Sequence, residues 1–202
     1  MPCQRDNGKI KMNVLGISGT PRKGGLTDNL LDKALEGARS AGGTTEKIVL
    51  NDMNFKPCQE CGDMTETGAC SIRDDMQGIY KKCELADAFI VASPVYFGTV
   101  SAQLKMMIDR FQAVWVRKYV LKSKPSYSKR RKGIFLCVGG MDTQEYFKNS
   151  KTVIKIWFAT LDIDYFGDLF FGGCNTKADK KEEKDRALNN AFELGKSLVS
   201  AF

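Results

Sequence analysis

Histidine is absent from all 202 residues of the sequence. Its absence excludes a Ser/His/Asp or Cys/His catalytic set and any metal site that depends on imidazole. Long apolar runs are missing too, because no stretch approaches the roughly 18 residues that a membrane span requires. The amino terminus, MPCQRDNGKIKM, is polar and charged. We therefore expect no membrane partner and no targeting signal.

A secretory signal and an even set of cysteines, the two marks of a disulfide framework, are also missing. The seven cysteines are scattered along the chain, which favours reduced thiols and a cytoplasmic location. A chain of this length can bury a core without metal or disulfide cross-links. We predict a single domain over residues 1–202, with an N-terminal extension at 1–10.

Acidic residues are absent from the segment 117–132, RKYVLKSKPSYSKRRK, which carries eight positive side chains. Because the whole chain has a net charge of +7, the remainder is about neutral. The pattern indicates a local basic insertion in the form of a solvent-exposed loop, and it argues against a nucleic-acid partner. A phosphate-bearing ligand or a partner subunit is the second interpretation of this segment.

Apolar segments of strand length alternate with segments of helical period along the chain. This alternation predicts an α/β fold, a flavodoxin-like three-layer sandwich with a five-stranded parallel sheet of order 2-1-3-4-5. The strands are expected at 12–18, 46–50, 88–98 (with a loop), 133–140 and within 164–173, and the helices at 26–38, 74–86, 101–116, 143–161 and from 181.

Two loops at the expected switch point of this sheet carry residues suited to a ligand. The first, SGTPRKGGLTDN at 18–29, combines hydroxyls, an arginine, an amide and glycines directly before a helix. Backbone N–H groups, hydroxyls and the positive end of a helix together form a phosphate site. An ordinary glycine-rich turn is the alternative, because the loop matches neither the Walker A spacing nor G-x-G-x-x-G.

The second loop, SPVYFGTV at 93–100, offers flat apolar surfaces at Tyr96 and Phe97 and a fixed backbone at Pro94, and Gly98 permits close backbone approach. A planar aromatic ligand that carries a phosphate would satisfy both loops. Packing of the two rings in the core is the alternative. We expect a loop whose backbone finds its partners away from the sheet.

Four stretches occur in a fixed order along the chain: GISGTPRKGGLTDNLL, CQECGDMTETGACSIRDDM, SPVYFGTVSAQLKMMIDR and FLCVGG. In this order and spacing they resemble the NADPH-dependent FMN reductase family, and within it the iron–sulfur flavoprotein branch. The resemblance covers nearly the whole chain from about Lys11. It implies a flavodoxin-like domain that binds FMN and forms a homodimer or homotetramer.

The resemblance also implies where FMN binds. The first loop would hold the phosphate, the second would run beside the isoalloxazine ring, and two glycines after the fourth strand would approach the ring from the other side. The residues implied are Ser18, Thr20, Arg22, Lys23, Thr27, Asn29, Pro94, Val95, Tyr96, Phe97, Gly98, Thr99, Gly139 and Gly140.

FMN accepts a hydride or single electrons, so no acid/base residue is required and none is expected to be catalytic. The leading hypothesis is an oxidoreductase that passes electrons from NAD(P)H, or from a reduced protein carrier, to a small acceptor such as a quinone or a flavin. The alternative is an electron-transfer flavoprotein that acts between protein partners such as ferredoxin. A nucleotide-binding module without redox turnover is a third hypothesis.

The loop at 51–73 contains three of the cysteines. Iron–sulfur flavoproteins carry C-x2-C-x2-C and a fourth cysteine here, and these hold a four-iron cluster. This chain has Cys58, Cys61 and Cys70, but Met64 stands at the third position. A thioether is a much poorer ligand for cluster iron than a thiolate. Cys83, on the next helix, is expected to be a packed thiol rather than a replacement ligand.

Four interpretations of the loop stay open. The three cysteines could hold an iron–sulfur cluster, either with three irons or with four irons and an external or distant fourth ligand. Cys58 and Cys61 could form a redox dithiol, although no helix starts there as redox motifs prefer. A structural zinc would lack a fourth ligand. The fourth interpretation is a loop that binds no metal.

Overall fold

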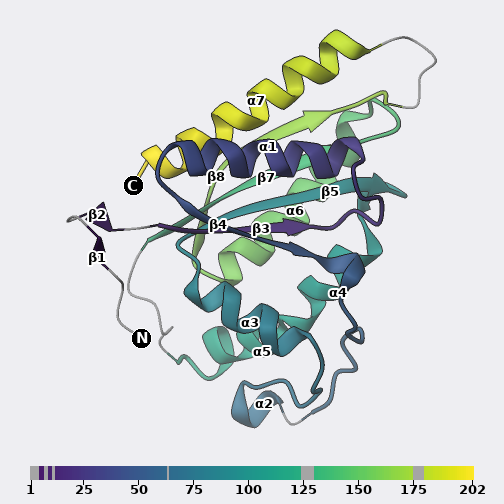
Figure 1. Ribbon diagram of the computed structural model, residues 1–202. Helices are drawn as coiled ribbons and strands as arrows, with labels where there is room; N and C mark the ends of the chain where they lie inside the picture. The colour runs from purple at the N-terminus through teal and green to yellow at the C-terminus, as the bar shows by residue number, and fades with distance from the viewer. Residues whose placement is uncertain (1–4, 7–8, 11, 63, 124–129, 175–179) are drawn as a thin grey trace.

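The computed structural model describes residues 5–6, 9–10, 12–62, 64–123, 130–174 and 180–202. Its central sheet has five parallel strands in the order β4-β3-β5-β7-β8 (Figure 1). Numbered along the chain this order is 2-1-3-4-5, so the predicted flavodoxin-like topology is confirmed. The five strands are β3 (Asn13–Ser18), β4 (Thr44–Val49), β5 (Ala88–Tyr96), β7 (Arg131–Val138) and β8 (Ile163–Phe171).

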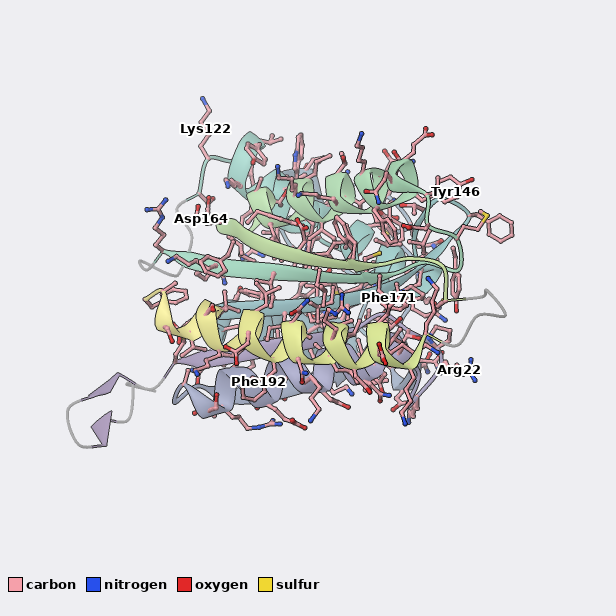
Figure 2. The ribbon with its side chains drawn as sticks, turned by 90° about the horizontal axis from the view of Figure 1, so that it is seen from above. Arg22, Lys122, Tyr146, Asp164, Phe171 and Phe192 are labelled. Atoms are coloured by element: carbon pink, nitrogen blue, oxygen red, sulfur yellow. The ribbon has the colours of Figure 1, made fainter. Side chains whose placement is uncertain are left out.

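Helices cover both faces of the sheet and complete the three layers (Figures 1 and 2). One face carries α1 (Leu26–Ser40) and α7 (Lys181–Ser200), and the other carries α3 (Met76–Leu85), α4 (Ala102–Arg110) and α6 (Gln144–Thr160). None of the helices in the described part of the chain is both long and apolar enough to span a bilayer. The short helical segments are η1 (Leu50–Asp52), α2 (Met64–Thr67), α5 (Gln112–Trp115) and the π-helical η2 (Val116–Val120).

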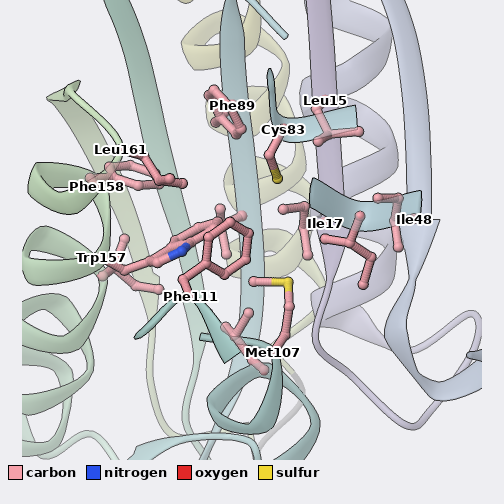
Figure 3. Close-up of a cluster of buried hydrophobic side chains, with 14 of the residues drawn as sticks. Leu15, Ile17, Ile48, Cys83, Phe89, Met107, Phe111, Trp157, Phe158 and Leu161 are labelled. Atoms are coloured by element: carbon pink, nitrogen blue, oxygen red, sulfur yellow. The ribbon is translucent and has the colours of Figure 1, made fainter. Parts of the chain in front are cut away.

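Aromatic side chains fill the core on the α3, α4 and α6 face (Figure 3). Phe111 meets the Trp157 ring edge-on at a centroid distance of 5.4 Å, and Tyr80 meets Phe111 at 5.1 Å. Such edge-to-face contacts add to the free energy gained from apolar burial. Cys83 belongs to the same cluster, and burial raises the pKa of its thiol to about 12. The prediction of a packed Cys83 is confirmed.

Two glycines let α1 and α7 pack backbone against backbone. A Cβ atom on Gly37 would lie 1.9 Å from the carbonyl oxygen of Phe192, and one on Gly195 would lie 1.9 Å from that of Ala34. No side chain fits at such distances, so both positions require glycine. Both contacts lie in the C-terminal halves of the two helices and fix where α7 crosses α1. The first turn of α7 lines the cleft at the carboxyl edge of the sheet.

The structure corrects the expected loop at 93–100. Strand β5 continues through Tyr96, and Pro94 still pairs with β7. The chain then reverses into β6 (Thr99–Val100), which pairs antiparallel with the end of β5. The backbone of this stretch is therefore satisfied within the sheet and its hairpin, not away from it. Near the amino terminus, β1 (Arg5–Asp6) and β2 (Lys9–Ile10) form a small hairpin that the sequence did not predict.

The prediction of a solvent-exposed basic loop at 117–132 is wrong at both ends. At its start, residues 117–120 are part of the π-helical η2. Arg131 is only 2% exposed, because β7 begins there, and its guanidinium donates to the carbonyls of Cys83 and Leu161. Lys132 donates to the carbonyl of Ala201 at 2.5 Å. These two side chains therefore tie the start of β7 to the ends of neighbouring segments at the amino edge of the sheet, opposite the carboxyl edge. Residues 124–129 of the segment lie outside the described part of the chain.

Candidate functional site

A cleft of about 1260 Å³ opens at the carboxyl edge of the sheet. It lies at the switch point between β3 and β5, where open α/β sheets bind their ligands. All of the predicted cofactor-binding residues line it except Ser18, Lys23 and Thr99. Three loops that are far apart in the sequence therefore meet in one cleft. Its lining from these loops is Thr20, Arg22, Thr27, Asn29, Pro94, Val95, Tyr96, Phe97, Gly98, Gly139 and Gly140.

The β3–α1 loop is shaped by Asp28, in the first turn of α1. One carboxylate oxygen of Asp28 accepts the Gly24 N–H at 3.1 Å, and the other accepts the Ser18 hydroxyl at 3.0 Å. Lys47 lies 2.9 Å from the same carboxylate. Burial alone would raise the pKa of Asp28, but the Lys47 ammonium and these hydrogen bonds hold that pKa below its ordinary value. The carboxylate therefore stays charged and fixes the loop.

Three predicted residues support the loops from outside the cleft lining. Ser18 is fully buried, and its hydroxyl is donated to Asp28. The Lys23 ammonium lies 2.6 Å from the carboxylate of Asp52. Thr99 is part of β6. The predicted residues of the first loop that line the cleft are thus Thr20, Arg22, Thr27 and Asn29. The side-chain amide of Asn29 also donates to the Gly24 carbonyl at 3.3 Å.

The β5–β6 hairpin places an aromatic ring at the cleft in a costly backbone conformation. Its two-residue turn has φ of +49° at Phe97 and +80° at Gly98. Positive φ is natural for glycine but costs a phenylalanine roughly 1–2 kcal/mol. Phe97 is nevertheless fully exposed, so no burial in the described structure offsets this cost. A strained and exposed ring beside a cleft is typical of a binding site.

The remaining cleft wall comes from residues that the sequence analysis missed. Figure 2 shows Arg22 and Tyr146 at the same end of the molecule, although they belong to opposite layers. The ring of Tyr146 lies against Gly98. The start of α7 borders the cleft because α7 packs against α1, a placement that the strand order alone could have suggested. Gly24 and Gly25, glycines of the predicted first loop, also line the cleft, and the missed lining residues are Leu26, Val138, Met141, Tyr146, Cys174, Lys181, Lys184, Asp185 and Leu188.

The cysteine loop lies on the other side of the sheet from α1 and α7, below α3 and α4 (Figure 1). The structure brings Cys58, Cys61, Met64 and Cys70 to the wall of one small cavity, together with the buried Arg110. The four residues that the sequence aligns with a cluster motif therefore line one cavity. Arg110, which the sequence analysis did not single out, donates to the Cys70 sulfur at 3.3 Å.

Comparison with known proteins identifies the chain's relatives. A model of the family described as "NADPH-dependent FMN reductase" matches residues 12–144. The chain belongs to this family. An iron–sulfur flavoprotein of Methanosarcina thermophila is 39% identical over 188 residues, which cover 93% of each chain. Another, from Archaeoglobus fulgidus, is 32% identical over 194 residues, or 95% of this chain and 80% of the relative.

Solved structures support the fold of this FMN reductase family member. An NAD(P)H:quinone oxidoreductase from Methanothermobacter marburgensis superposes with a TM-score of 0.73 at 21% identity, covering 93% of this chain and 96% of the other. An FMN-dependent NADH-azoreductase from Bacillus anthracis, solved in complex with FMN, gives a TM-score of 0.72 at 18% identity, covering 93% and 99%. At these identities the likeness shows a shared flavodoxin-like fold.

The residues of the cleft fit FMN, the cofactor of this family. Hydroxyl, amide and guanidinium groups gather where α1 begins, and the residue at its N-cap is Gly25, so no side chain covers the helix end. Such a helix end attracts a phosphate. Apolar and glycine surfaces follow at the ends of β5 and β7, as a planar ring requires. When bound, FMN supplies the electron-accepting chemistry.

The cysteine loop of this family member does not fit the cluster that its relatives' names imply. A four-iron cluster needs four thiolates or close substitutes, but this loop offers three thiols and the neutral thioether of Met64. In the described part of the chain, no three cysteine, aspartate or glutamate side chains are placed to hold a metal ion.

Proposed function

We propose that the chain is an FMN-dependent oxidoreductase that takes electrons from NAD(P)H and passes them to a small acceptor such as a quinone or a free flavin. The observation that carries the proposal is the single cleft formed by the β3–α1 loop, the β5–β6 hairpin and the Gly139–Gly140 turn. A family match over residues 12–144 supports the cofactor. The chemistry resides on the flavin, so the protein contributes binding and orientation.

In this proposal the β3–α1 loop would bind the FMN phosphate. The Arg22 guanidinium would pair with the phosphate, and the hydroxyls of Thr20 and Thr27 and the amide of Asn29 would donate hydrogen bonds to it. Asp28 would not contact the phosphate. It would position the loop, because its carboxylate accepts the Gly24 N–H and so fixes the curvature of the backbone. The loop's geometry is thereby set before the ligand arrives.

The ring would lie between the end of β5 and the Gly139–Gly140 turn. Gly139 is held by two backbone bonds, since its N–H donates to the carbonyl of Phe171 at 2.8 Å and its own carbonyl accepts the N–H of Cys174 at 3.2 Å. The turn therefore offers a firm backbone surface to the ring. Phe97 and Tyr96, both exposed at the hairpin, would limit the access of water and substrate to the opposite side.

The test is spectroscopic. The purified protein should be yellow, and apoprotein should bind FMN more tightly than riboflavin, because riboflavin lacks the phosphate that the first loop recognises. Anaerobic mixing with NADPH should then bleach the flavin absorbance quickly. Protein that stays colourless and cannot be loaded with FMN would contradict the proposal.

A second candidate function is that of an electron-transfer flavoprotein between protein partners such as ferredoxin. It is favoured by one observation, the 39% identity to a protein named an iron–sulfur flavoprotein. Under this alternative NADPH would leave the flavin oxidised, and reduced ferredoxin would bleach it. The two donors, compared on the same preparation, distinguish the two candidates.

We also propose that the protein forms a homodimer or homotetramer. The exposed rings of Trp115 on α5 and Tyr119 on η2, 5.4 Å apart, form an apolar patch with the exposed Val120 and with Leu121, which follows η2. Exposed apolar patches of this kind mark protein contacts. Light scattering after size-exclusion chromatography tests it, and a monomer at micromolar concentration would contradict it.

A further inference from the structure

We propose that the cysteine loop of this chain folds around the side chain of Arg110 in place of an iron–sulfur cluster, and that Met64 is the residue that prevents cluster binding. The loop's ends and one of its cysteines converge on a single buried guanidinium. The inference about the loop stands on these contacts alone. Its consequence for the electron donor, given below, rests on the proposed function.

Arg110 ties both ends of the loop together. It is only 1% exposed, and its guanidinium donates to the Lys56 carbonyl at 2.8 Å and to the Ile72 carbonyl at 3.3 Å. It also lies 2.7 Å from the carboxylate of Asp74 and 3.3 Å from the Cys70 sulfur. One side chain thus fixes the entrance, the exit and a cysteine of the loop, as a metal centre would.

The outer side of the loop is closed by protein contacts as well. The Arg117 Nε donates to the Gly68 carbonyl at 3.2 Å. Gly68 is buried with a φ of +64°, and a Cβ there would lie 2.8 Å from the stem of Arg117 and 3.1 Å from Leu121. The short helix α2, which carries Met64, is therefore seated against η2. No metal is needed to define this conformation.

Charge balance at the cavity also argues against a cluster. An iron–sulfur cluster held by thiolates is anionic, and a neighbouring guanidinium could offset that charge. Here Asp74 already faces Arg110, and the pair holds the pKa of Asp74 below its ordinary value in spite of burial, which would raise it. The positive charge of Arg110 is thus largely neutralised before any thiolate forms.

Among the residues that the structure describes, the cavity lacks the fourth thiolate that a four-iron cluster requires, and this deficit is decisive. Cys58, Cys61 and Cys70 supply three thiols, and the fourth sulfur at the cavity is the Met64 thioether. A thioether is neutral and binds cluster iron far more weakly than a thiolate. If the chain functions as proposed, the loop provides no one-electron entry point. Electrons would then reach FMN at the cleft itself, as a hydride from a nicotinamide donor.

The experiment compares wild type, Met64→Cys and Met12→Cys after anaerobic incubation with ferrous iron and sulfide, followed by desalting. Iron, zinc, acid-labile sulfide and FMN are measured per chain. Met12→Cys is the matched control, because Met12 packs against the core on the α1 and α7 side of the sheet. We expect near-zero metal in wild type and in Met12→Cys, and about four irons and four sulfides in Met64→Cys.

Wild-type protein that retains about three or four irons, or one zinc, overturns the proposal. If wild type and Met64→Cys both stay free of metal while Met64→Cys retains its FMN and its unfolding temperature, Met64 is not the deciding residue and that part is overturned. The metal content of the wild type is measured without any substitution, so the proposal can be contradicted even if Met64→Cys misfolds. FMN content is read separately, so its absence would count against the proposed function only.

Discussion

The flavin cleft and the cysteine loop are both irregular segments next to the same sheet, but they are built on different principles. The cleft is formed by many groups from several segments, with polar and aromatic side chains, glycines at 24, 25, 98, 139 and 140, and a free helix end. The cysteine loop depends on a few specific side-chain atoms, namely three thiols and the guanidinium of Arg110. A site that draws on many groups is weakened when one side chain changes, whereas a metal-ligand site fails when one donor atom is lost.

This difference explains how the chain can keep one family feature and lose another. The family match covers the cleft-forming loops within residues 12–144, and each of them reaches the cleft. In the cysteine loop one substitution, Met64 in place of a thiolate, removes a ligand. The loop then keeps its shape because protein contacts, not metal, hold it. Four experiments test how independent the two regions are.

The largest effect is expected from Arg110→Ala. Breaking a buried ion pair costs about 3–5 kcal/mol because the partner, here Asp74, is left buried and unpaired. Denaturant unfolding should show this loss, and limited proteolysis should cut within 56–74. FMN affinity of the remaining folded protein should be unchanged. Arg73→Ala, on an exposed arginine nearby, should alter stability by less than about 0.5 kcal/mol. Lost flavin affinity would show that the regions are coupled.

Gly37→Ala should have the next largest effect. The new methyl group would meet the backbone of Phe192, so α7 must move away from α1 at a cost of about 2–3 kcal/mol. Because the start of α7 borders the cleft, FMN should also bind more weakly. Gly78→Ala on α3, where a Cβ meets open space, should instead stabilise the protein by about 0.4–1 kcal/mol. Equal effects of the two substitutions in thermal unfolding would contradict the close packing.

Arg22→Ala should weaken FMN binding by about 1.5–3 kcal/mol, the scale of a charge-assisted hydrogen bond to phosphate. Riboflavin affinity, which involves no phosphate, should change little. The control is Lys23→Ala, because Lys23 pairs with Asp52 and lies outside the cleft lining. Fluorescence titration of the apoprotein measures all of these affinities. If Lys23→Ala weakens FMN binding as much as Arg22→Ala, the residues of the phosphate site have been assigned incorrectly.

The smallest effect concerns pH. The pKa of Asp28 in the folded state lies below its ordinary value of 3.8, so its stabilising contribution is fully present above about pH 4 and is lost as the pH falls through the folded pKa. Asp74 follows the same rule. Unfolding free energies measured from pH 6 downward should therefore fall less steeply for Asp28→Asn and Asp74→Asn than for wild type. Only Asp28→Asn should weaken FMN binding, since Asp74 belongs to the cysteine loop.

Much of the fold was predictable because its strands are strongly marked. The run at Asn13–Ser18 is apolar between its two end residues and is followed by Gly19, and the helix after it repeats leucines at helical spacing. The exact end of β5 was not predictable, since Pro94 and Gly98 normally signal a loop. The strand continues there because β6 supplies the missing backbone partners. Likewise the sequence places Arg131 in a basic loop, whereas in the structure β7 begins at this residue.

By itself, the sequence determined the alternation of five strands with helices along the chain, the two principal loops of the cleft and the missing thiolate at Met64, because these depend on local apolar period and on residue chemistry. Only the tertiary structure decided which side chains share a site. The start of α7 reaches the cleft because Gly37 and Gly195 allow close helix packing, and Arg110 reaches the cysteine loop from α4. Both are contacts between distant segments, and no local pattern encodes them.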